Sequence, residues 1–205
     1  VSYTNYEVHT DKSPLPLFIN KNITIEGNSG KLSTDADCDA LIVRSPIQLG
    51  ANVTFKNINL QLVPQVILGR EGAKSILGSQ NPMAATIFAS GNILTLDNVN
   101  TKVGTNSSQD KDRPYLSGGS YKNQGSIGEK SVINIINPNS QTKFSGIYAG
   151  DYWEARNLDV EINLDGNILE NKIYTGGLSK ILTGNVDITL GDKSNIYSFD
   201  NKNHN

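Results

Sequence analysis

The chain has 205 residues, of which 37% are hydrophobic, 7% aromatic and 19% charged, so core-forming side chains are scarce for one domain of this length. It contains 25 Asn and 19 Gly, two residue types that disfavour helices and favour turns, so a mainly helical protein is disfavoured. The net charge of −2 argues against nucleic acid as a partner. No apolar run is long enough for membrane insertion.

Short runs in which apolar and polar residues alternate recur along the whole chain. Each run has three to six residues, is rich in β-branched types, and is bounded by turn-forming residues, which is the pattern of β-strands. In chain order the runs are 17–19, 23–25, 41–43, 53–55, 58–62, 86–88, 93–96, 132–135, 159–164 and 186–190. No stretch keeps a helical apolar stripe over two turns, and the nearest candidate, 65–77, is interrupted by Gly69 and Gly72.

Related segments return at intervals typical of a solenoid. An Ile-Tyr pair ends at Tyr148, Tyr174 and Tyr197, and the first two of these units are each followed by a second strand at a matching place. In the N-terminal half, similar strands follow Asn22, Asn52 and Asn92. Strands alone would also suit a closed sheet or a sandwich, but repeats of about 20–30 residues indicate coils that bury their apolar faces by stacking.

Asn suits the turns of such coils, because it tolerates left-handed backbone and its amide can form a ladder from coil to coil. We expect the repeated tyrosines to stack as a structural ladder.

Two parts of the chain resemble known repeat proteins. The run Asn-Val-Thr-Phe-Lys-Asn-Ile-Asn-Leu at 52–60 resembles the coil pattern of right-handed parallel β-helix proteins of the pectin-lyase-like superfamily, over about 15–100. The Ile-Tyr-x-Gly-Gly units, over about 144–199, resemble the Tyr-Gly-Gly-type repeats of large bacterial cell-surface proteins. This chain departs from the commonest repeat, since Ala149 replaces one first Gly and Ser198-Phe199 replace a whole pair.

These patterns and resemblances together predict an all-β fold. We expect residues 1–205 to form a single right-handed parallel β-helix (β-solenoid) of about six to eight coils, with loop insertions at 64–85 and 104–130. Both ends look like cuts from a longer polypeptide, so the rest of that polypeptide is an expected partner. The resemblance implies a protein that is secreted or exposed on a bacterial cell surface.

Residues suited to catalysis or metal binding are few. The two histidines, His9 and His204, lie near opposite termini, which disfavours catalysis through a histidine. Alternating carboxylates open like a calcium-binding loop, but Ala40 and Pro46 stand where that loop needs Gly and Glu. We therefore favour a solvated turn over a Ca²⁺ site for these carboxylates, and we expect no other cofactor. The carboxylates are Asp35, Asp37 and Asp39.

Aromatic residues mark two candidate binding segments. One holds the single Trp of the chain beside acidic and basic groups, as in platforms where rings stack on a ligand and charges orient it. A turn whose Trp packs on the solenoid fits this segment equally well. Its candidate residues are Asp151, Tyr152, Trp153, Glu154 and Arg156. The long polar insertion supplies a second patch, Arg113, Tyr115 and Tyr121, for which a flexible excursion is the alternative.

The expected function is that of a non-catalytic, adhesin-like module of an exported surface protein, which binds host extracellular protein or glycan. The alternative is a polysaccharide-active enzyme, a lyase or glycoside hydrolase, on the same scaffold. Such an enzyme requires at least two carboxylates and a Lys or Arg close together on one sheet. A structural stalk is the second alternative.

Overall fold

The computed structural model describes twelve segments of the chain, which together hold all the features reported below. Within them the regular secondary structure consists of β-strands alone, which confirms the all-β prediction. No helix in this part of the chain is long and apolar enough to cross a membrane. The described residues are 2–3, 16–27, 40–43, 45–62, 86–101, 113–121, 128–139, 142–150, 158–166, 172–176, 184–191 and 198–200.

The strands form three sheets in which every pair is parallel. The seven-stranded sheet contains β2 (Leu17–Ile19), β5 (Ile47–Leu49), β8 (Thr86–Phe88), β10 (Tyr115–Ser117), β12 (Gly146–Tyr148), β14 (Lys172–Tyr174) and β16 (Ser198–Asp200). The six-stranded sheet contains β3 (Ile23–Glu26), β6 (Val53–Lys56), β9 (Ile93–Asp97), β11 (Lys130–Ile136), β13 (Asp159–Leu164) and β15 (Val186–Leu190). The three-stranded sheet contains β1 (Ser2–Tyr3), β4 (Ala40–Val43) and β7 (Asn59–Leu62).

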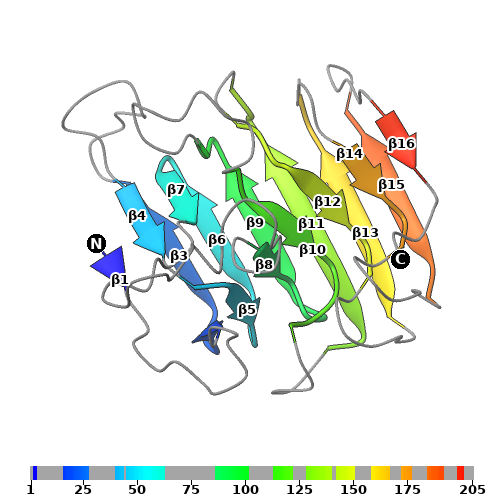
Figure 1. Cartoon of the computed structure of the whole chain (residues 1–205), viewed down its shortest axis with the longest axis horizontal. Helices are drawn as coiled ribbons and strands as arrows, with labels where there is room; N and C mark the ends of the chain where they lie inside the picture. Colours follow the sequence, from blue (N-terminus) through cyan, green and yellow to red (C-terminus); the bar gives the residue numbers. More distant parts are fainter. Residues whose placement is uncertain are drawn as a thin grey trace, which may run out of the picture.

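The chain visits the sheets in turn. Strands β1, β2 and β3 belong to three different sheets, and β4 to β6 and β7 to β9 repeat this order. From β10 onwards the strands alternate between the seven-stranded and the six-stranded sheet. Figure 1 shows that the strands consequently stack in sequence order along the long axis, from blue to red. An isolated bridge between Asn59 and Asn100 extends the three-stranded sheet into the next coil. This arrangement of stacked parallel sheets is consistent with a β-solenoid.

The register gives the length of each coil. Tyr148 pairs with Tyr174 and Tyr174 pairs with Asp200, so these two steps are equal. The Asn185 N–H donates to Asp159 Oδ1 over the same step, a separation of 26 along the chain. The repeats in the sequence predict that Tyr197 follows Tyr174 in this row, and that prediction is wrong because Asp200 occupies the position. Tyr197 itself lies outside the described residues.

The first coil is longer than the C-terminal ones. Leu17 pairs with Ile47, and the Asn52 N–H donates to Asn22 Oδ1 over the same step, a separation of 30 along the chain. Coil length therefore varies while the register between neighbouring strands is kept.

The core is built from rows of inward-facing side chains that run across the strands. Along the six-stranded sheet, strands β6, β9, β11 and β13 alternate between buried and more exposed residues, as their sequences predict. One inward row of the seven-stranded sheet is apolar from strand to strand: Leu17, Ile47, Ile87, Leu116, Ile147 and Ile173. Burial of each such side chain contributes about 1.5–3 kcal/mol, and it requires a neighbouring coil on each side.

Asparagine occupies one corner of successive coils, directly after the six-stranded sheet. Asn57, Asn98 and Asn137 have φ angles of 48°, 51° and 48°, a left-handed backbone that Asn tolerates better than most residues. At the same corner of the following coil stands Gly166, with φ 112°. A side chain there would also meet Pro138, whose ring atoms lie 2.8 Å from where a Cβ would be.

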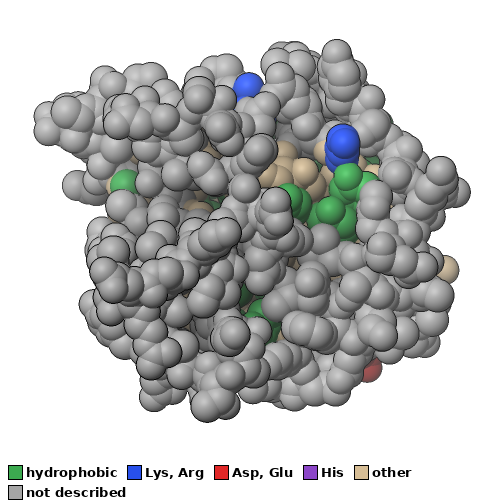
Figure 2. Space-filling model, viewed as in Figure 1, with side chains coloured by type: hydrophobic (Ala, Val, Ile, Leu, Met, Phe, Trp, Pro, Cys, Tyr) green, Lys and Arg blue, Asp and Glu red, His purple; other side chains and the backbone are tan. Residues whose placement is uncertain are grey.

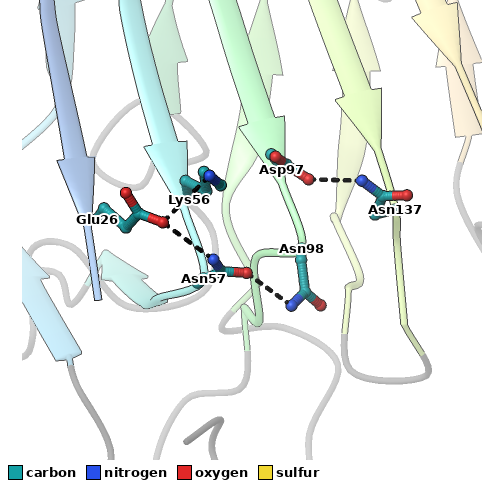
Figure 3. Close-up of polar contacts among 6 residues, drawn as sticks. All are labelled: Glu26, Lys56, Asn57, Asp97, Asn98 and Asn137. Carbon is teal, nitrogen blue, oxygen red and sulfur yellow. Dashed lines mark hydrogen bonds and ion pairs between the residues drawn. The ribbon is translucent and has the colours of Figure 1, made fainter. Parts of the chain in front are cut away.

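Side chains at this corner are joined from coil to coil, as the sequence predicts for Asn. Asn98 donates its amide to Asn57 Oδ1 at 2.9 Å, and Asn57 donates to Glu26 Oε1 at 3.1 Å (Figure 3). Asn137 instead donates to Asp97, whereas Asn139 continues the ladder by donating to Asn98 Oδ1 at 3.1 Å. The ladder satisfies polar groups that the turns would otherwise leave to solvent and fixes the coils in register.

One predicted insertion contains part of the regular stack. Strand β10 lies inside 104–130 and pairs with β8 on one side and β12 on the other, and Lys130 begins β11. The prediction that all of 104–130 leaves the coil is therefore wrong. The physical reason is Leu116, which is fully buried between Ile87 and Ile147 although its flanks are rich in Gly and Ser. The other predicted insertion, 64–85, lies outside the described residues.

Candidate binding face

The outward side of the six-stranded sheet is its exposed polar side. We call this side the outer face of the six-stranded sheet. Because alternate residues of a strand point to opposite sides, the register aligns the outward residues in rows across the coils. The central row consists of hydroxyl and amide side chains: Thr24, Thr54, Thr95, Asn134, Asn163 and Thr189.

Hydrogen bonds connect members of this central row. Asn134 donates its amide to Thr95 Oγ1 at 3.3 Å, and Asn163 donates to Asn134 Oδ1 at 2.9 Å. Asn163 also donates to Glu161 Oε1 at 2.7 Å in its own strand. The row thus presents oriented amide and hydroxyl groups on a sheet whose backbone is held by its own ladder. Such groups can donate to and accept from a hydroxyl-rich ligand.

A charged cluster lies beside the row at its C-terminal half. Lys130 Nζ is 2.6 Å from Glu161 Oε2. Asp159 is the register partner of Lys130, and Asp187 is that of Glu161. The hydrogen bond from Asn163, followed by that from Lys130, lowers the pKa of Glu161, and the hydrogen bond to Glu161 raises the pKa of Lys130. Both groups are therefore charged at neutral pH, as an exposed ion pair.

The face as a whole is acidic. The six strands of this sheet contain five carboxylates and two lysines, in a chain whose net charge is −2. One lysine, Lys56, pairs with Glu26 at 3.2 Å, and the other is the partner of Glu161. Such a surface repels polyanions and is compatible with neutral glycans or basic proteins.

The outward side of the seven-stranded sheet has a different character, because its side chains are largely buried. The rings of Tyr148 and Tyr174 stack with centroids 4.4 Å apart and planes 9° from parallel, and Tyr115 lies 6.0 Å from Tyr148. This confirms the tyrosine ladder for Tyr148 and Tyr174. Gly146 leaves space for the rings, since a Cβ there would lie 3.0 Å from the Tyr148 ring.

Burial affects both the ionisation and the access of these tyrosines. Burial, reinforced by the neighbouring tyrosines, raises the pKa of Tyr148. In Figure 2, hydrophobic side chains of described residues gather over β12 and β14 beside a basic side chain, and acidic side chains show only at the lower edge. Stacked and buried rings hold the sheet together and offer little free ring surface to a ligand.

The sequence-predicted site residues are only partly brought together. Tyr121 is 1% exposed, and its ring meets Phe88 edge-on with centroids 5.8 Å apart. Its backbone N–H donates to Gln48 Oε1 at 3.2 Å. Tyr121 thus packs on the seven-stranded sheet and does not present its ring to solvent, unlike the expected contact patch. Tyr115 joins the tyrosine ladder instead, whereas Arg113 is partly exposed just before β10.

The remaining candidates, Asp151, Tyr152, Trp153, Glu154 and Arg156, lie outside the described residues, as do Asp35, Asp37 and Asp39. Among the residues that the structure describes, no group of three His, Cys, Asp or Glu side chains could hold a metal ion.

The outer face of the six-stranded sheet is a candidate that the sequence analysis did not identify. Its signal is present in the alternation Asp-Val-Glu-Ile-Asn-Leu at 159–164 and Val-Asp-Ile-Thr-Leu at 186–190, whose polar positions match one for one at the C-terminal coil step. No family model, curated protein or solved structure matches the chain.

Proposed function

We propose that the chain is a non-catalytic module of an exported bacterial surface protein, and that it binds host protein or glycan through the outer face of the six-stranded sheet. The observation that carries this proposal is the row of hydrogen-bonded amides and hydroxyls on a parallel sheet. A single right-handed solenoid is part of the same proposal, because parallel crossover connections are right-handed in about 98% of cases.

The charge of the face narrows the ligand class. Five carboxylates against two lysines disfavour anionic polysaccharides and favour neutral glycans or basic extracellular proteins. Amides such as Asn134 and Asn163 are already oriented by their neighbours, so these side chains lose little conformational entropy when a ligand binds.

The test is an array of glycans and extracellular-matrix proteins probed with the purified chain. Binding by the wild type should be lost in the double variant Asn134→Ala, Asn163→Ala and retained in Lys172→Ala, an exposed change on the seven-stranded sheet. Absence of binding by the wild type at high density would overturn the proposal and favour the structural stalk. If the double variant binds as well as the wild type, the binding site lies elsewhere than on this face.

The rival function, a polysaccharide-active enzyme, has one observation in its favour. Lys130 and Glu161 are in contact, with Asp159 and Asp187 adjacent in register, which meets the minimal requirement for carboxylates beside a cation. A general acid, however, needs a raised pKa, and the pKa of Glu161 is lowered. Release of reducing ends or unsaturated products by the wild type, abolished in Glu161→Gln, would establish the enzyme instead.

A further inference from the structure

Aliphatic side chains flank the middle of the central row on the outer face of the six-stranded sheet. Val132 and Ile136 lie two positions before and after Asn134 on β11, so all three point outward, and both aliphatic residues are half-buried. Ile93, the register partner of Val132 on β9, is 39% exposed. Strands β6 and β15 continue the sheet on either side of β9, β11 and β13, so this part of the face lies inside the stack and not at its end.

The charged Glu161 fixes the direction of the hydrogen bonds in the row. A carboxylate only accepts, so the atom of Asn163 that lies 2.7 Å from Glu161 Oε1 is the amide nitrogen. The second proton of this nitrogen goes to Asn134 Oδ1 at 2.9 Å, and Asn134 in turn donates to Thr95 Oγ1 at 3.3 Å. The bonds therefore run in one direction, from Asn163 through Asn134 to Thr95.

This direction determines what the row offers to a ligand. Both amide protons of Asn163 are taken, and no bond of this residue in the described part of the chain uses its Oδ1, which is left as an acceptor. Thr95 Oγ1 accepts from Asn134, which leaves its hydroxyl proton to be donated. A donor and an acceptor thus stand on the outer face on opposite sides of Asn134.

The spacing of these two groups fits one secondary amide. Thr95 and Asn163 are two strands apart, which is about 9–10 Å at the usual spacing between strands. The C=O and N–H of a trans amide point in opposite directions, so an amide above Asn134 can accept from Thr95 and donate to Asn163. Its two carbon substituents then extend along β11, over Val132 and Ile136, where apolar groups lose contact with water.

The rest of the row favours a sugar as the carrier of this amide. Of the six positions of the central row, all of which the structure describes, only that of Asn134 has aliphatic neighbours on both sides along its strand. A peptide presents an amide at every residue, whereas an N-acetylated sugar presents one amide and a methyl group among hydroxyls. Hydroxyls of the ligand find partners in Thr54 and Thr24, and the acidic face disfavours a ligand with carboxylates.

We propose that the outer face binds a neutral glycan through an N-acetylated amino sugar, whose acetamido group lies above Asn134 and bonds to Thr95 and Asn163. The methyl group of the ligand packs on one of the two aliphatic neighbours, Val132 or Ile136, and the sugar ring lies over the other. This inference rests on the proposed function and specifies its ligand class.

The test compares three tetrasaccharides of the same β-1,4 linkage, titrated into the full chain by calorimetry at physiological salt. They consist of N-acetylglucosamine, glucose and glucosamine. We expect the N-acetylated tetramer to bind roughly tenfold more tightly than the glucose tetramer, which lacks the amide and its methyl group. It should also bind more tightly than the cationic glucosamine tetramer, whose attraction to the acidic face is screened by salt. In saturation-transfer NMR, the acetyl methyl protons should receive the largest signal.

Two isosteric variants on the central row form a matched pair. Thr95→Val removes the donated hydroxyl proton and should lower the preference for the N-acetylated over the glucose tetramer roughly fivefold, the effect of one hydrogen bond of about 1 kcal/mol. Thr54→Val makes the same change on β6, where the neighbours along the strand are Asn52 and Lys56, and should leave that preference unchanged. Circular dichroism checks that both variants fold.

Several results would overturn this inference and leave a binding function in place. They are equal affinity for the N-acetylated and glucose tetramers, tighter binding of the glucosamine tetramer, and an equal change of preference in the two valine variants. Equally tight binding of the acetylated peptide Ser-Gly-Ser-Gly would assign the face to peptide amides instead. If the N-acetylated tetramer does not bind while another ligand on the array does, only the ligand class is wrong. If the array is also negative, the proposed function fails as well.

Discussion

At the scale of single residues, asparagine has two separate roles. Asn57, Asn98 and Asn137 adopt left-handed backbone at one corner of the coil, and their amides, with that of Asn139, bridge successive coils. Composition alone indicates turns, but only the register shows which distant positions of the chain are neighbours. The two roles can be separated by mutation, because Gly keeps the backbone conformation and lacks the amide.

Substitution of Asn98 makes this separation measurable. We expect Asn98→Gly to lower the free energy of unfolding by about 1 kcal/mol through loss of its bonds to Asn57 and Asn139. Asn98→Ala should cost a further ~1–2 kcal/mol, because Ala adopts a φ near 51° poorly. Urea unfolding of both variants provides the values. Equal stability of the Ala and Gly variants would contradict a role for the left-handed backbone.

Tyr148 predicts a pH dependence of stability at the same scale. Burial raises its pKa above the ordinary value of 10.0, so the folded protein holds the phenol proton after the unfolded chain has released it. Unfolding then becomes more favourable as pH rises above about 10, and the contribution is constant below that pH. Urea midpoints measured from pH 8 to 11 should fall more steeply for the wild type than for Tyr148→Phe. Parallel curves would show that Tyr148 does not govern the decline.

At the scale of elements, the longer strands were predictable and the three-residue strands less so. Runs such as 159–164 and 186–190 coincide with β13 and β15, because alternation over five or six residues is a distinct signal. Strand β10 is too short to show a period and is flanked by Gly and Ser, so its sequence resembles a loop. Its inclusion is decided by the fit of Leu116 between neighbouring coils, which is a tertiary effect.

Position in the stack should decide the cost of truncating an inward side chain. Leu164 and Leu190 occupy the same row, but Leu190 belongs to the last strand of the sheet. We expect Leu164→Ala to lower the free energy of unfolding by about 2–5 kcal/mol, the range for fully buried leucines. Leu190→Ala should cost about 1 kcal/mol or less, since half its surface is already exposed. Equal losses in chemical denaturation would mean that the β15 edge is covered in solution.

At the scale of the whole molecule, repetition was the informative signal for the fold. Stacked parallel coils follow from the returning Ile-Tyr and Asn-strand units, whereas the proposed binding face depends on coil lengths that vary along the chain. In the central row, Thr95 and Asn134 are 39 residues apart along the chain, and Asn134 and Asn163 are 29 residues apart. No single period in the sequence therefore reveals that these residues form a row. The sequence analysis predicted binding sites at aromatic residues instead, and the structure shows that Tyr115 and Tyr121 pack against other rings.

A stack of coils should tolerate removal of one whole repeat. Excision of 149–174 removes one complete coil, with β13 and β14, and leaves β11 and β12 to pair with β15 and β16 in the same order. Since each coil contacts mainly its neighbours, the shortened chain should still fold and unfold cooperatively, with a lower urea midpoint because one coil interface is lost. Excision of 162–174 alone, half of that coil, is the control, since it cuts β13 and removes β14, and it should abolish cooperative unfolding. If the complete-coil deletion also lost its cooperative transition, the molecule would be stabilised by contacts that span more than adjacent coils.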